Sequence, residues 1–164
     1  MKIESLHELF VDELQDLYDA ENQIIEALPK MAEKASSPEL RSAFEQHLRE
    51  SEGQLQRLDQ IFDQLPDFDR DDKTCKGVEG IIKENETLIK EAKDPDVRDA
   101  GMIAGAQRVE HYEIAAYGTV RTYAQMLGKR EWAQLLQQTL DEEKNTDQKL
   151  NQLAERINVE AKAA

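Results

Sequence analysis

The sequence contains few of the residues that interrupt helices or cross-link a chain. Among its 164 residues are one cysteine, four prolines and seven glycines. A single cysteine, Cys75, excludes an internal disulfide and a four-cysteine metal site. The prolines and glycines lie mostly near the ends of expected helices, which argues against a β-sandwich and against a disordered chain. The length suffices for one domain with a hydrophobic core.

The sequence also lacks a long apolar run and an excess of basic residues. No segment approaches the roughly 18 consecutive apolar residues of a membrane-spanning helix, and the N-terminal stretch MKIESLHELF lacks the apolar core of a secretory signal. A net charge of −14 disfavours nucleic-acid phosphate and anionic membranes as partners. We therefore expect a soluble, cytoplasmic protein that binds neither nucleic acid nor membrane.

Apolar residues recur at intervals of three and four, the period of one helix face. They predict four long helices and one shorter helix, at 5–34, 37–65, 95–127, 130–157 and 77–93. Ser5 and Glu8 form a capping box, Ser37 and Asp94 precede prolines as N-caps, and Gly128 is typical of a C-cap. Two helical hairpins joined by a long connection predict an all-α, four-helix bundle with one crossover that carries the short helix.

Each long helix carries polar residues within or beside its apolar stripe. In chain order, these residues are Glu21, Glu50, Gln54, Glu110, Glu113, Glu143 and Asp147. Glu21 and Glu50 lie at nearly equal distances from the first turn, and Glu113 and Glu143 lie at equal distances from Gly128. Because the rise is about 1.5 Å per residue, each pair lies about 22 Å from its loop, near the middle of the bundle.

These polar residues have the composition of a metal site. A buried carboxylate is unfavourable unless it is paired or binds a cation. Six carboxylates in one low-dielectric centre would need cations or several protons. Two divalent metal ions, bridged by some of these carboxylates, would offset most of the charge. The spacing therefore favours a dinuclear metal site, with the Gln54 amide as a further oxygen donor.

The same residues also have interpretations that involve no metal. In a chain with 35 acidic residues, any one of these glutamates can lie in solvent at the edge of the bundle. Gln54 can form an ordinary hydrogen bond between helices, and Asp147 can pair with Lys144 or Lys149.

The histidines and tyrosines are weaker candidates. His47 lies on the core side of its helix, and we interpret it as a core histidine in preference to a donor to a ligating group. His111 points away from the glutamate face of its helix, so we do not expect it to be a ligand. Tyr18 and Tyr117 lie one turn from two of the glutamates, where they can donate hydrogen bonds to carboxylates or act as ordinary core tyrosines.

Three segments, HLRESEGQLQRLDQIF, QRVEHYEIAAYGT and TLDEEKNTDQKL, resemble the YciE/YciF-like proteins of the ferritin-like superfamily. The resemblance covers nearly the whole chain. It implies a single ferritin-like domain over residues 1–164, a homodimer and an association with stress responses. By similarity to rubrerythrin and ferritin, it implies metal ligands at Glu21, Glu50, Glu110, Glu113 and Glu143.

One departure from the superfamily pattern affects the expected metal. The relatives usually place histidine three residues after the glutamate on the second and fourth helices, where this chain has Gly53 and Thr146. Gln54 and Asp147 can substitute one residue later. A site with oxygen donors alone favours iron or manganese, with magnesium or calcium as further options, over zinc or copper.

Two functions are compatible with this site. The first is stress protection through metal binding or through oxidation of ferrous iron by oxygen or peroxide. If the protein is an enzyme, it would then be a di-metal oxidoreductase of the ferroxidase or peroxidase type. The alternative is a non-catalytic structural or interaction protein with a vestigial metal site, which dimerises through the Val78–Ile82 face of the short helix.

Overall fold

The computed structural model describes residues 3–71 and 73–164, and the regular secondary structure in these residues is entirely helical. The five helices are α1 (Leu6–Lys34), α2 (Pro38–Phe62), α3 (Lys76–Glu91), α4 (Pro95–Met126) and α5 (Arg130–Ala163). The expectation of an all-helical bundle is confirmed at this level. Within the described residues, no helix combines the length and the apolarity that crossing a bilayer would require.

The helices begin and end at residues with identifiable capping roles. The Ser5 hydroxyl accepts a hydrogen bond from the Glu8 N–H at 3.1 Å, and Asp94 accepts from two N–H groups in the first turn of α4. Gly128 ends the α4–α5 turn with a φ of 73°, a conformation in which a side chain would be strained. α2 ends at Phe62 rather than at the expected Leu65, because the residue before Pro66 is disfavoured in a helical conformation.

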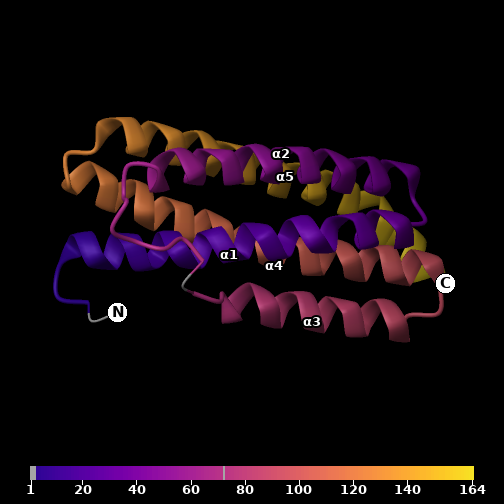
Figure 1. Ribbon diagram of the computed structural model, residues 1–164. Coiled ribbons are helices and arrows are strands. Elements are labelled where there is room, and N and C mark those ends of the chain that lie inside the picture. Colours follow the sequence, from indigo (N-terminus) through magenta and orange to yellow (C-terminus); the bar gives the residue numbers. More distant parts are fainter. Residues whose placement is uncertain (1–2, 72) are drawn as a thin grey trace.

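The four long helices form two antiparallel hairpins, α1 with α2 and α4 with α5, whose loops lie at opposite ends of the molecule (Figure 1). α3 lies alongside α1 and α4 and brings the chain back to the end where α4 begins. α5 is longer than expected and continues to Ala163, since its last turns contain good helix formers and neither glycine nor proline.

The hydrophobic core is divided into two clusters along the bundle. One contains residues near the α4–α5 loop, among them Phe10, Leu58, Tyr117 and Leu136. The other contains residues near the α1–α2 loop, among them Ile24, Phe44, Met102 and Leu150. Buried polar side chains separate the two clusters at mid-height. The polar interruptions in the apolar stripes therefore lie at one level in the folded chain.

The short helix α3 does not present the surface that we expected for a dimer. Val78 is fully buried in the second cluster of its own chain, and Ile81 and Ile82 pack partly buried against the same cluster. The amphipathic face of α3 is directed at α1 and α4, because the crossover follows the groove between them. A dimer through the Val78–Ile82 face would therefore need this packing to be undone, and the homodimer itself stays a prediction.

Candidate metal centre

Four glutamates from three helices meet in the polar layer between the two hydrophobic clusters. Glu21 comes from α1, Glu110 and Glu113 from α4, and Glu143 from α5, and each side chain has no exposed surface. On every helix the glutamate continues the apolar stripe, so the packing that buries the stripe also buries the carboxylate. Burial of four acidic groups at one level is costly unless protons or cations compensate their charge.

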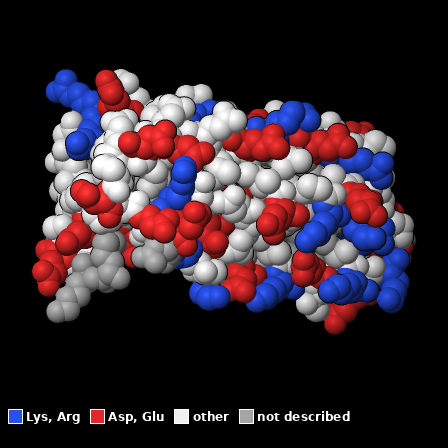
Figure 2. Space-filling model, in the orientation of Figure 1, with Lys and Arg blue, Asp and Glu red and all other residues white. Residues whose placement is uncertain are grey.

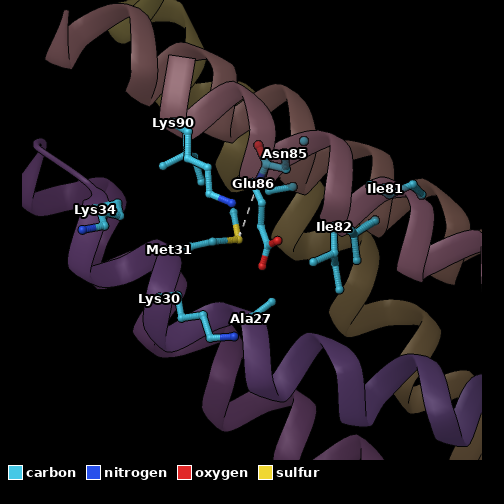
Figure 3. Close-up of a pocket in the computed structure, with 13 residues that line it drawn as sticks. Ala27, Lys30, Met31, Lys34, Ile81, Ile82, Asn85, Glu86 and Lys90 are labelled. Atoms are coloured by element: carbon cyan, nitrogen blue, oxygen red, sulfur yellow. Dashed lines mark hydrogen bonds between the residues drawn. The ribbon is translucent and has the colours of Figure 1, made fainter. Parts of the chain in front are cut away.

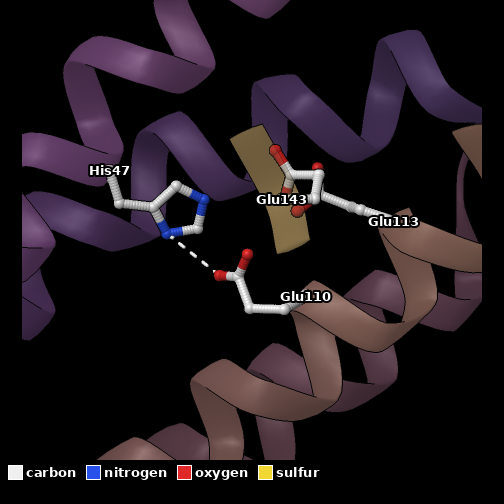
Figure 4. Close-up of side chains that lie close together, drawn as sticks. All are labelled: His47, Glu110, Glu113 and Glu143. Carbon is white, nitrogen blue, oxygen red and sulfur yellow. Dashed lines mark ion pairs between the residues drawn. The ribbon is translucent and has the colours of Figure 1, made fainter. Parts of the chain in front are cut away.

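His47 on α2 completes the group from the remaining long helix. Its Nδ1 lies 3.2 Å from Oε1 of Glu110, and the side chain is almost fully buried. One potential ligand atom from each of His47, Glu110, Glu113 and Glu143 lies within 4.8 Å of the others. Figure 4 shows these four side chains turned toward a common centre. Distances of this size are compatible with ligands that surround a metal ion.

Many polar atoms in this layer have no hydrogen-bond partner among the described residues. They include both carboxylate oxygens of Glu113, Oε2 of Glu110, one oxygen each of Glu21 and Glu143, Nε2 of His47 and the side-chain oxygen of Gln54. Oε1 of Glu110 has only its contact with Nδ1 of His47, which lacks hydrogen-bond geometry. Buried polar atoms are nearly always satisfied in native proteins, so such a concentration calls for water, protons or an ion. Carboxylate, imidazole and amide groups are all metal ligands.

Three hydrogen-bond donors hold parts of the layer in place. The Tyr117 hydroxyl donates to Oε1 of Glu21 at 2.5 Å. The Gln54 amide donates to Glu143, and also to Oε2 of Glu142 at 3.2 Å. Arg57 forms a two-armed contact with Glu142, with nitrogen–oxygen distances of 2.6 and 2.7 Å. The chain thus orients one oxygen each of Glu21 and Glu143 and leaves the other without a partner.

The burial of these groups changes their acidity. Burial and the negative charge of Glu143 raise the pKa of Glu21 to about 8, against the lowering effect of the Tyr117 hydrogen bond. Burial, followed by the charge of Glu143, raises the pKa of Glu110 and of Glu113 well above the usual glutamate value. Burial lowers the pKa of His47. Without cations, the layer would therefore hold protons on carboxylates and a neutral imidazole at neutral pH.

Comparison with known proteins identifies the family. The family "Domain of unknown function (DUF892)" matches residues 5–163. The chain belongs to the DUF892 family. It is 44% identical to Protein YciF of Escherichia coli K12 over 154 residues, which are 94% of this chain and 93% of YciF. This similarity confirms the expected YciE/YciF-like family.

Solved structures of DUF892 relatives have the same fold. The crystal structure of the E. coli stress protein YciF superposes with a TM-score of 0.90 at 42% identity, over 94% of this chain and 98% of YciF. YcfI from Rhodopseudomonas palustris, described as a candidate structural protein, gives a TM-score of 0.87 at 41% identity. That match covers 92% of this chain and 95% of YcfI.

Two of the expected site residues of this DUF892 chain lie outside the buried cluster. Glu50 is at the rim, where its carboxylate accepts hydrogen bonds from Thr146 at 3.1 Å and Gln46 at 2.8 Å. Asp147 lies on the outer side of the α4–α5 contact and accepts a hydrogen bond from Gln107. Their expected inward orientation is therefore corrected. Each successive residue turns about 100° around a helix, so an error of one position changes the face.

His47 is the residue that the sequence interpretation undervalued. The buried face of α2 runs through Phe44, His47, Ser51, Gln54 and Leu58, with alternating steps of three and four. This spacing was the available signal, and Glu50 does not fit it. The expectation of a site with oxygen donors alone is therefore corrected, because an imidazole lies among the carboxylates. His111 is exposed and lies 3.3 Å from Asp147, away from the cluster as expected.

Replacing Tyr117 by phenylalanine should destabilise the protein, because it leaves both oxygens of Glu21 without a donor. An unsatisfied buried acceptor costs about 1–3 kcal/mol, which corresponds to a Tm lower by several degrees in a chain of this size. Thermal unfolding followed by circular dichroism measures the change. Tyr123→Phe is the matched control, since Tyr123 is partly buried in the same cluster on the same helix and its hydroxyl forms no hydrogen bond within the described residues. Equal effects of the two changes would contradict the assigned role of Tyr117.

Proposed function

We propose that this protein is a stress-associated, ferritin-like protein that binds two divalent metal ions in its central polar layer. The observation that carries the proposal is the set of fully buried carboxylates with unpartnered oxygens around His47. The description of the relative YciF as a stress protein supports the association with stress. The two hairpins and the long crossover with α3 are compatible with a ferritin-like bundle.

The donor set fits iron or manganese best. Glu110, Glu113, Glu143 and His47 would hold one part of the centre, and Glu21 would contribute from α1. Four carboxylates carry as much negative charge as two divalent ions carry positive charge, so the filled layer would be close to neutral. A mixture of carboxylate and imidazole donors is typical of iron and manganese, whereas magnesium and calcium prefer oxygen alone.

The chain's own groups would prepare this centre for its ions. Tyr117 and Gln54 hold Glu21 and Glu143 in fixed orientations, which reduces the reorganisation needed when an ion binds. The two hydrophobic clusters exclude bulk water from the layer on both sides. Carboxyl groups with a raised pKa would release protons as ions enter. Bound iron or manganese would supply the electrons for reduction of oxygen or peroxide.

A metal titration tests this proposal. Protein purified without chelator should contain iron or manganese, and the metal-free form should take up two equivalents of Fe(II) or Mn(II) per chain under anaerobic conditions. Metal analysis and isothermal titration calorimetry measure the stoichiometry, and proton release should accompany binding in a weakly buffered solution. Addition of oxygen or peroxide to the Fe(II) form then tests oxidation. Failure to bind either metal at a defined stoichiometry would reject the proposal.

A non-catalytic structural or interaction protein is the second candidate function. It is favoured by the description of the Rhodopseudomonas relative as a candidate structural protein. In this case the central layer would be protonated or hydrated, and the protein would act through binding to a partner or a second copy. A Tm that is the same with and without chelator would favour this function, because a bound metal must stabilise the folded state.

A further inference from the structure

The helix α3 covers its neighbours incompletely. Of its 16 residues, only Val78 and Asn85 are buried, although α3 also carries Ile81, Ile82 and Ile89 on the side that faces α1 and α4. These three side chains remain partly exposed at a cavity of about 220 Å³ between α1, α3 and α4. An engineered apolar cavity of roughly 150 Å³ is large enough to bind benzene. The space under α3 can therefore hold a substantial apolar group.

The cavity has an apolar wall and a positively charged mouth. Its apolar lining includes Ala27, Met31, Ile82, Ala106 and Val109. Lys30 and Lys34 of α1 and Lys90 of α3 line it together with Glu86. Lys34 lies 3.9 Å from Glu33, so the local charge is an excess of one positive charge. Figure 3 shows Lys30 and Lys90 on either side of Glu86.

This positive mouth is unusual for a chain of net charge −14. Neither Lys30 nor Lys90 forms an ion pair in residues 3–71 and 73–164. Many of the basic side chains on the face in Figure 2 gather in the region that α3 occupies in Figure 1. Lys30 and Lys90 are therefore available to a negatively charged ligand.

A buried amide beside the cavity is also unsatisfied. Asn85 is 7% exposed, its side-chain oxygen has no hydrogen-bond partner among the described residues, and its amide nitrogen reaches only the sulfur of Met31, at 3.8 Å. Gly105 allows this close packing, since a Cβ there would come within 2.5 Å of the Asn85 side chain. An unpaired amide lowers stability unless something else satisfies it.

A second, smaller space lies on the core side of the cavity. It has a volume of about 20 Å³, shares the lining residues Ala27, Met31 and Ile82 with the cavity, and is also lined by His47 and Glu110. The core side of the cavity is thus mostly apolar, and its mouth is basic. This arrangement favours a ligand whose apolar chain points inward and whose anionic group stays at the lysines.

We propose that the cavity between α1, α3 and α4 binds a single-chain amphiphile with a carboxylate head group, such as a medium-chain fatty acid. The alkyl chain lies against Ile81, Ile82, Met31 and Val109, and the carboxylate pairs with Lys30 and Lys90. None of these contact residues belongs to the proposed metal centre, so the proposal does not rest on that centre.

Calorimetric titration with dodecanoate tests the proposal. One dodecanoate should bind per chain, and dodecyltrimethylammonium, which has the same tail and a positive head, should bind at least about tenfold more weakly. The net charge of the protein would favour the cation, so the opposite preference reports the local lysines. Equal binding of both amphiphiles, or binding of neither, would overturn the proposal.

Two variants localise the binding. Lys30→Glu with Lys90→Glu should weaken dodecanoate binding by about tenfold or more. The matched control Lys144→Glu with Lys162→Glu changes two exposed lysines on α5, which does not line the cavity, and should leave dodecanoate binding unchanged. Ala27→Phe, which places a ring in the cavity, should abolish binding while circular dichroism shows an intact helical fold.

Other occupants give different results. If the protein cosediments with phosphatidylglycerol vesicles but does not bind monomeric dodecanoate, the basic mouth binds a membrane surface. The other outcome, seen in sedimentation velocity, is a dimer that binds no dodecanoate and that Lys30→Glu with Lys90→Glu converts to monomers. That result would assign the cavity to a second copy of the chain. Either result would overturn the proposal.

Discussion

Replacing Glu113 and Glu143 together by glutamine should abolish metal binding and make the metal-free protein more stable. Both side chains are fully buried, and glutamine keeps their shape while removing two ionisable groups from the low-dielectric layer. The metal-free variant should gain about 1–3 kcal/mol in its free energy of unfolding, because folding no longer has to protonate or bury these acidic groups. Saturating metal should raise the Tm of the wild type by several degrees and leave that of the variant unchanged.

The matched control for this variant is Glu50→Gln with Asp147→Asn. It also removes two carboxyl groups, but from side chains that lie outside the buried cluster and already accept hydrogen bonds. The control should keep the two-ion stoichiometry in calorimetry and metal analysis. If the control lost its metal while Glu113→Gln with Glu143→Gln retained it, the cluster would not be the binding site.

The metal-free protein should lose stability as the pH rises from about 4.5 to about 8. Glu21 has a pKa of about 8 in the folded chain against a reference value of 4.5, and the pKa values of Glu110 and Glu113 are raised as well. The folded state therefore binds more protons than the unfolded state in this range, so the free energy of unfolding falls with pH. Glu21 alone should account for roughly 3 kcal/mol or more of this decrease in the free energy of unfolding.

Denaturant unfolding at several pH values, with chelator present, measures this slope. His47 has a lowered pKa, so it contributes in the opposite direction below about pH 6.5. With saturating metal the slope should reverse, because ions bind the deprotonated ligands more tightly as the pH rises. A metal-free protein whose stability increased steadily between pH 5 and pH 8 would show that the central carboxylates are not protonated in the folded state.

The burial of the four central glutamates could be predicted because it depends on a period within each helix. Glu21, Glu110, Glu113 and Glu143 occupy stripe positions, and whatever buries Leu17 or Tyr117 also buries the carboxylate one turn away. The height of the layer was predictable for a related reason. Antiparallel hairpins fix height by the number of residues to the turn, and a small error in that number moves a residue by only about 1.5 Å.

The same one-residue error has a large effect on orientation. Glu50 and Ser51 lie at nearly the same height on α2, yet Ser51 is fully buried and Glu50 is at the rim. Likewise Thr146 is on the buried face of α5, and Asp147 faces outward to His111. Charge and helix period alone do not distinguish such neighbours when both are polar.

By itself, the sequence determined the helices, their caps and the level at which acidic residues interrupt the core. These features depend on local conformation and on the spacing of residues within one helix, which the chain carries without reference to its neighbours. Only the tertiary structure decided that His47 joins the carboxylates and that α3 packs on its own chain above an open cavity. Those features depend on the rotation of each helix against the others, which is determined by side-chain packing between segments far apart in the sequence.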